Sequence, residues 1–156
     1  SLNGIIAGGA LGIALAGDYR IANKSTKLLS AHFKRGFVPA GGATYILPRL
    51  IGLARTQTLF FGGKTLNSDE MLEWGLVHEI VDDGKLEKRT LQMAEELAAG
   101  PTNAIAETKK LLIDSDALSL TEELAREREK NKNSGNSGDA VEGIKAFIEK
   151  REPKFE

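Results

Sequence analysis

His32 and His78 are the two side chains whose ordinary pKa lies near neutral pH, so they are the first candidates for acid or base chemistry. His32 follows a mostly apolar stretch and precedes Lys34 and Arg35. A lone histidine in such a place is more often structural than catalytic, and both interpretations stay open for it. His78 lies within an expected strand, which favours a structural role. The sequence has no cysteine, which excludes disulfides and thiolate chemistry, and two distant histidines are a poor basis for zinc, so we expect no metal.

A cluster of glycines, Gly4, Gly8, Gly9 and Gly12, is the second candidate site. Its spacing is not that of a dinucleotide fingerprint, and no P-loop lysine follows, so phosphate binding is only weakly indicated. Close packing of a buried helix is one explanation for the small residues. The alternative is chemical, because a helix that begins near Gly9 presents free backbone N–H groups and the positive end of its dipole to a developing oxyanion.

The C-terminal tail combines cations with aromatic rings. It contains Lys145, Phe147, Lys150, Arg151, Lys154 and Phe155. This pattern suits either a solvated helix face or a surface that grips phosphates and stacks on the adenine of a nucleotide-like ligand.

The amino-acid composition restricts the class of protein and its partners. The 156 residues carry a formal charge of -1, with 41% hydrophobic and 28% charged residues, which is typical of one soluble domain with no overall attraction to nucleic acid or anionic membrane. No apolar run reaches the ~20 residues that span a bilayer, and the start lacks the features of a signal peptide. We therefore expect a cytoplasmic protein without nucleic-acid or membrane partners.

The elements that must position these residues follow from hydrophobic patterning and helix signals. We expect a helix over 9–17 that is buried on all sides, and a loop over 34–42. Ser68 is expected to cap a helix that ends at Gly75, and a polar segment over 131–138 to separate the last two helices. The sequence predicts strands over 18–22, 27–30 and 76–81. It predicts a further helical stretch over 43–50 that continues after Gly52 from 53 to 61, and helices over 85–99, 103–113, 120–132 and 139–150.

Several stretches in order resemble the crotonase superfamily, the enoyl-CoA hydratase/isomerase family. They are Asn3-Gly4 with Ala7-Gly8-Gly9-Ala10, Leu15 to Ala22, Phe37-Val38-Pro39-Ala40-Gly41-Gly42, Leu47-Pro48-Arg49-Leu50-Ile51-Gly52, Gly75-Leu76-Val77, and Gly143 to Arg151. The resemblance implies an α/β ββα-spiral core over residues 1–100 and a helical trimerisation region over 101–156. Family chains usually extend further at the N-terminus, so we expect this sequence, which lacks an initiator methionine, to be the C-terminal part of such a chain.

The resemblance implies acyl-CoA thioesters as substrates and assigns Gly9 as one of two backbone donors to the thioester oxygen. The second donor lies in the N-terminal part of family chains. The two glutamates with which the hydratases add water correspond to Gly12 and His32, neither of which is a carboxylate. This argues against ordinary hydration and favours an isomerase or another enolate-forming variant, with His32 as the group that moves a proton.

The resemblance also places Gly8, Pro39, Ala40, Phe147 and Lys150 among the residues that contact substrate. It implies a homotrimer or hexamer and no cofactor beyond the CoA of the substrate itself, because a stabilised thioester acidifies its own α-carbon. A non-catalytic oligomeric scaffold that has lost the chemistry is the alternative.

Overall fold

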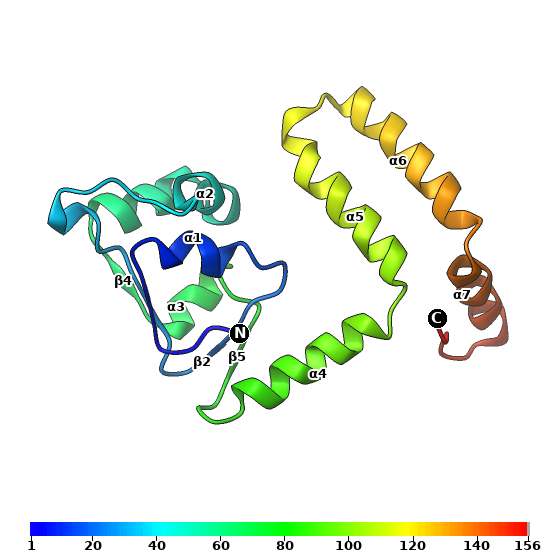
Figure 1. Ribbon diagram of the computed structural model, residues 1–156, viewed down its shortest axis with the longest axis horizontal. Coiled ribbons are helices and arrows are strands. Elements are labelled where there is room, and N and C mark those ends of the chain that lie inside the picture. The colour runs from blue at the N-terminus through cyan, green and yellow to red at the C-terminus, as the bar shows by residue number, and fades with distance from the viewer. Residues whose placement is uncertain (156) are drawn as a thin grey trace. The chain divides into compact units, whose positions relative to one another are not determined.

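A computed structural model describes residues 1–155, which divide into two compact units (Figure 1). The first unit, Ser1–Leu91, contains all the strands of the described chain together with several helices. The second begins at Gln92 and consists of helices joined by short connections.

The first unit is a mixed α/β structure with two small sheets. In one sheet β1 pairs in parallel with β3, and β3 pairs antiparallel with β4; in the other, β2 pairs in parallel with β5. Its elements are β1 (Ile5–Ala7), α1 (Ala10–Leu15), β2 (Ile21–Asn23), β3 (Lys27–Leu29), the 3-10 helix η1 (Phe33–Arg35), α2 (Ala43–Phe61), β4 (Thr65–Leu66), α3 (Ser68–Glu73) and β5 (Glu79–Val81).

Apolar side chains from the strands, from α1, α2 and α3 and from the segments between them form the core of this unit, with leucine the most frequent residue. The largest side chains with essentially no exposed surface include Leu11, Leu28, Leu47, Leu59, Leu66, Met71 and Leu76. The helix α2 bends at Gly52, whose φ of 74° lies outside the helical region, so both halves of the expected 43–61 helix form around a kink. Both halves direct buried residues into the same core.

Polar side chains fix the turn that separates β2 from β3. The hydroxyl of Thr26 donates to the carbonyl oxygen of Leu2 at 2.9 Å and lies 2.5 Å from Oδ1 of Asn23. The side-chain amide of Asn23 donates to Oδ1 of Asn3. Because buried polar groups are costly without partners, this network specifies where the two strands separate, and they enter different sheets.

Several sequence expectations for this unit are wrong in detail. The strand expected over 18–22 is β2, which lies later, at Ile21–Asn23, because Arg20 is drawn inward, where its Nε donates to the carbonyl oxygen of Leu76. The strand expected over 76–81 begins at Glu79, since the N–H groups of Leu76 and Val77 bond back to Met71.

Two helix expectations also change. Asn67, not Ser68, caps α3, because its side chain accepts from the N–H of Glu70 while the Glu70 carboxylate accepts from the N–H of Asn67. The helix α1 is not buried on all sides: Leu11 and Leu15 face the core, whereas Ile13 is 78% exposed.

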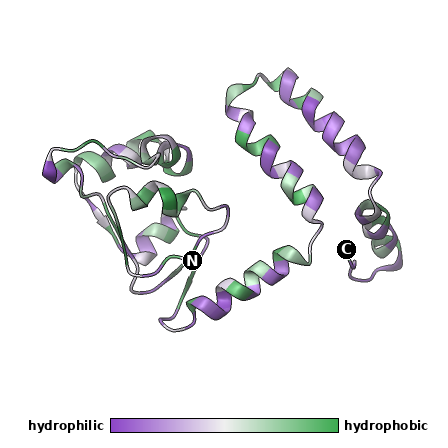
Figure 2. Cartoon of the chain, in the orientation of Figure 1, coloured by the Kyte–Doolittle hydropathy of each residue, from purple (hydrophilic) through white to green (hydrophobic). Residues whose placement is uncertain are grey.

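All regular secondary structure of the second unit is helical. It contains the larger part of α4 (Leu86–Ala98), followed by α5 (Thr102–Asp114), the 3-10 helix η2 (Ser115–Ala117), α6 (Leu120–Gly135) and α7 (Gly138–Glu149). Colouring by hydropathy shows α6 to be largely hydrophilic and α7 to carry a more apolar surface (Figure 2). Within residues 1–155, no helix is both long and apolar enough to cross a membrane.

Side-chain caps set the boundaries of these helices. Ser119 caps α6 with a capping box, and the hydroxyl of Ser137 accepts from the N–H of Ala140 at the start of α7. The expected break over 131–138 is therefore confined to Asn136 and Ser137. The polar residues before that point continue α6 through Gly135, and Asn136 takes its C-cap position.

Candidate functional site

Gly9 lies at the turn between β1 and α1. Gly8 turns the chain with a φ of 60°, and its carbonyl oxygen accepts from the N–H of Leu11. Gly9 then occupies the N-cap position with a φ of -59°. Its own N–H makes no backbone hydrogen bond within residues 1–155, and the residue is exposed. Because α1 has only six residues, its macrodipole is short. The group that could bind an oxyanion is therefore this single N–H.

Three glycines bring α1 and the 39–42 loop into backbone contact. A Cβ added at Gly12 would lie 1.5 Å from the carbonyl oxygen of Gly41, and a Cβ added at Gly41 would lie 2.4 Å from the carbonyl oxygen of Gly9. Gly41 also has a φ of 68°, which side chains disfavour. The contact closes off the position of Gly12 to any side chain and fixes the loop beside Gly9.

His32 lies beyond the end of β3 and caps η1. Its carbonyl oxygen accepts from the N–H groups of Arg35 and Phe37, at 3.0 and 3.1 Å, which holds the turn after it. Its side chain is buried, with 9% exposed, and its ring meets the ring of Phe60 edge-on with 6.5 Å between centroids. The Nδ1 atom is enclosed and has no hydrogen-bond partner among the described residues, as is also true of Oγ of Ser30.

A cavity of about 350 Å³ opens beside His32, between η1, the loop after it and one face of α2. His32 is the one titratable side chain among those that line it. The lining consists of His32, Phe33, Phe37, Val38, Pro39, Thr44, Pro48, Leu53, Thr56, Gln57, Phe60 and Phe61. The cavity is therefore mainly apolar and brings together His32 and Pro39 of the sequence-predicted residues.

The first unit gathers five of the seven predicted site residues. Gly8 and Gly9 form one edge, Ala40 adjoins Gly41 at the backbone contact with Gly9, and Pro39 continues the loop to the cavity and His32. No local sequence pattern indicates the contact across Gly41. The aromatic lining was not predicted either, because Phe60 and Phe61 come from a helix far along the chain.

Phe147 and Lys150 belong to the second unit. Phe147 is 85% exposed on α7, and Lys150 ends that helix in the left-handed region with a φ of 55°. The neighbouring Arg151 is used internally, because its guanidinium pairs with Glu142 at 2.6 Å and with Glu149 at 2.6 Å. Lys150 and Phe147 remain the tail's candidates for ligand contact.

His78 has the environment of a structural residue. Its Nδ1 accepts from the N–H of Arg20 at 3.0 Å, and its ring stacks on Tyr19 with 4.4 Å between centroids. Partial burial, followed by the charge of Arg20, lowers the pKa of His78. Across the described chain, no group of three His, Cys, Asp or Glu side chains is placed to hold a metal ion.

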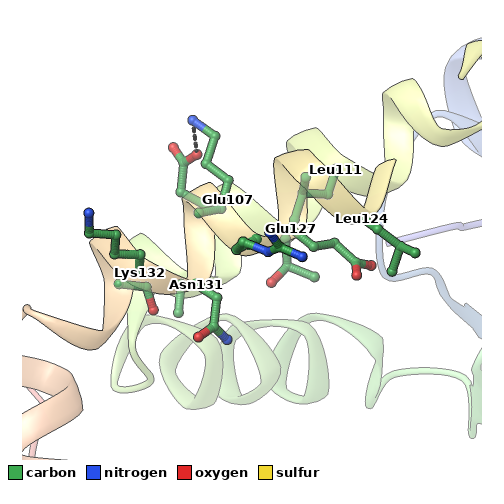
Figure 3. A pocket seen from close by; sticks show the side chains of 11 residues that line it. Glu107, Leu111, Leu124, Glu127, Asn131 and Lys132 are labelled. Carbon is green, nitrogen blue, oxygen red and sulfur yellow. Dashed lines mark ion pairs between the residues drawn. The ribbon is translucent and has the colours of Figure 1, made fainter. Parts of the chain in front are cut away.

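A second hollow lies between α5 and α6 and is lined mostly by polar and charged side chains (Figure 3). Glu107 pairs there with Lys110 at 2.6 Å and with Lys130 at 2.9 Å, which ties the two helices together. The hydrogen bonds from Lys110 and Lys130 lower the pKa of Glu107 to about 2. None of the sequence-predicted site residues lines this hollow, and its paired charges account for its polar character.

Comparison with known proteins identifies the class to which this arrangement belongs. The family "Enoyl-CoA hydratase/isomerase" matches residues 1–156. The chain is 36% identical over 155 residues to the 1,2-epoxyphenylacetyl-CoA isomerase of Escherichia coli, covering 99% of this chain and 59% of that protein. It is 34% identical to the trans-2-decenoyl-[acyl-carrier-protein] isomerase of Streptococcus mutans, with the same two coverages.

Solved structures agree with the sequence matches. The crystal structure of an enoyl-CoA hydratase from Bacillus anthracis superposes with a TM-score of 0.90 at 32% identity, covering 97% of this chain and 59% of that one. The chain therefore belongs to the enoyl-CoA hydratase/isomerase family and has its crotonase-type α/β fold. It spans about three fifths of the length of these relatives.

The close contact between Gly12 and Gly41 leads to a prediction about stability. Gly12→Ala would force a methyl group into the carbonyl of Gly41, so we expect it to lower the free energy of unfolding by about 3 kcal/mol, the upper end for overpacking. Gly17→Ala is the control, because a Cβ there meets only ordinary contacts, the nearest at 3.7 Å. Urea denaturation of both variants measures the difference. Equal stabilities would show that the loop moves away without cost.

The Glu107 pairs make a prediction about acid stability. The folded-state pKa lies below the ordinary 4.5, so the stabilisation is present above that pH and is lost as pH falls from about 4.5 to about 2. Glu107→Gln should therefore flatten the fall of the melting temperature across that interval. Glu127→Gln is the control, since this carboxylate lines the same hollow without an ion pair among the described residues. An unchanged acid profile for Glu107→Gln would mean that the pairs contribute nothing measurable.

Proposed function

We propose that the protein binds acyl-CoA thioesters and stabilises a thioester enolate, and that it acts as an isomerase or a related variant rather than as a classical hydratase. The observation that carries this proposal is the contact between Gly12 and Gly41. It leaves no room for a carboxylate at Gly12, the position that corresponds to the first of the two hydratase glutamates.

The Gly9 amide is the proposed donor to the thioester oxygen. The residue is exposed, its N–H makes no backbone bond within the described chain, and Gly41 packs against its carbonyl group and Cα. A donor that is already oriented stabilises developing negative charge without reorganisation, which is why loss of one oxyanion donor typically costs about 2.7–4 kcal/mol. The second donor that the family resemblance implies is part of the proposal for the whole protein.

Water addition needs an acid and a base that hold one water between them, and the described residues of this site include no such pair. Gly12 has no side chain, and His32 is the one titratable group on the apolar cavity. One proton-carrying group suffices to move a proton between two carbons of an enolate, which is the chemistry of isomerisation. The names of two relatives, both isomerases, support this preference.

The remaining predicted residues take roles as substrate contacts. Gly8 shapes the turn before the donor, and Pro39 and Ala40 form the loop between Gly9 and the cavity. Phe147 and Lys150 are proposed to contact the CoA, with the ring available for stacking and the ammonium group for phosphate. No cofactor besides the CoA of the substrate is invoked, and the proposed setting is a cytoplasmic homotrimer or hexamer.

A non-catalytic scaffold is the second candidate, and one surface favours it. The helix α7 exposes Val141, Ile144, Phe147 and Ile148, each more than 60% accessible. Large exposed apolar side chains in one helix favour association with another protein surface. An oligomer that binds free CoA and acyl-CoA equally, or neither, would fit the scaffold and not the enzyme.

The donor role of Gly9 can be tested by removing only its N–H. A proline fits the φ of -59°, and an added Cβ meets no atom within 4 Å apart from those of its chain neighbours, so Gly9→Pro deletes the donor with a compatible φ, while Gly9→Ala retains it. We expect Gly9→Pro in the full-length protein to slow exchange of the α-protons of an acyl-CoA with deuterated water about 100- to 1,000-fold, and Gly9→Ala to have a small effect.

The exchange is followed by NMR, and thermal melts confirm that both variants fold. Equal exchange rates in the two variants would remove Gly9 from the mechanism. A native protein that catalyses no exchange with any acyl-CoA would reject the enzymatic proposal as a whole.

A further inference from the structure

The His32 side chain that lines the cavity is buried without a hydrogen-bond partner for its Nδ1 atom among the described residues, which the fold alone does not explain. His32 is nine-tenths buried, its Nδ1 is enclosed without a partner, and within residues 1–155 no hydrogen bond to either ring nitrogen is made. A buried polar group without a partner destabilises a folded chain and calls for an explanation. The described residues make no hydrogen bond to this ring, and the ring lines a cavity. Its unused hydrogen-bonding groups therefore indicate that a ligand binds in the cavity.

The dimensions of the cavity restrict the ligand. A volume of about 350 Å³ lies at the small end of the roughly 300–1,000 Å³ found for small-molecule sites. That is too little for a whole acyl-CoA but suits one acyl group. The cavity also lies within reach of Gly9. Pro39 lines it, and Gly41, two Cα steps of about 3.8 Å further on, contacts the Gly9 backbone.

The lining indicates the chemistry of the acyl group. Four phenylalanines surround the cavity: Phe60 is buried against His32, while Phe33, Phe37 and Phe61 are each more than 60% exposed. Aromatic rings gain energy from offset and edge-to-face contacts with other rings, beyond what their buried area provides. A flat ring in this cavity would use those contacts, whereas a flexible straight chain would not.

We infer that this cavity selects an aromatic acyl group, with the thioester oxygen at the Gly9 amide and the ring among the four phenylalanines. The inference rests on the proposed function and adds the class of substrate. The placement also puts His32 against the acyl carbons between the thioester and the ring, where a group that moves a proton has to stand.

The test compares phenylacetyl-CoA with octanoyl-CoA, which have the same number of acyl carbons, by isothermal titration into the full-length protein, with free CoA as control. We expect the aromatic thioester to bind about tenfold more tightly, and Phe37→Ala to remove that preference. Leu53→Ala is the matched variant, because it opens the same cavity without removing a ring. It should weaken both ligands alike.

Two outcomes would overturn the inference: octanoyl-CoA binding as tightly as phenylacetyl-CoA, or Phe37→Ala leaving the preference intact. Exchange of the α-protons of acetyl-CoA separates this failure from failure of the proposed function, because an acetyl group is too short to enter the cavity. Exchange without an aromatic preference rejects the cavity assignment alone. Absence of both exchange and acyl-dependent binding rejects the enzymatic function, and exposed phenylalanines would then mark a surface for protein contact.

Discussion

The backbone contact among Gly9, Gly41 and Gly12 is the constraint on which the rest of the site depends. The carbonyl of Gly41 lies so close to Gly12 that a methyl group at Gly12 would overlap it. A methyl group at Gly41 would likewise overlap the carbonyl of Gly9. Because a backbone, unlike a side chain, cannot rotate aside, the contact fixes the 39–42 loop against α1. The Gly9 amide, the loop and the cavity beyond Pro39 are thereby held in one arrangement.

The same contact limits the chemistry available to the site. In this chain the carbonyl of Gly41 occupies the space that a side chain at Gly12 would need. Restoring a glutamate at Gly12 alone would displace the loop before it supplied a carboxylate. Our proposal therefore assigns the proton transfer to His32, whose enclosed Nδ1 has no hydrogen-bond partner among the described residues.

Sequence patterns predicted the elements that have strong local signals. The helical stretch over 43–61 and its interruption at Gly52 follow from apolar periodicity and one glycine. The family resemblance predicted the fold that the comparisons confirm. The position of β2 and the identity of the cap of α3 were missed, because long-range bonds of Arg20 and a competing asparagine decide them.

The site was predictable only in part, for a related physical reason. Residues close in sequence, such as Gly8 and Gly9, carry their own conformational signal, whereas the Gly12 contact and the pairing of His32 with Phe60 arise from segments that tertiary folding brings together. Nothing in a single sequence specifies such distances. The assigned roles of Gly9, His32, Pro39, Ala40, Phe147 and Lys150 remain predictions for the whole protein.

The most direct measurement of the central claim is the infrared spectrum of an acyl-CoA that carries carbon-13 at its thioester carbonyl, bound to the full-length protein. If the Gly9 amide is an oriented donor to that oxygen, the carbonyl stretch should shift to lower wavenumber than in water, because a fixed donor in a less polar surrounding polarises the bond more strongly. A bound thioester whose stretch lies at or above its value in water would contradict the account.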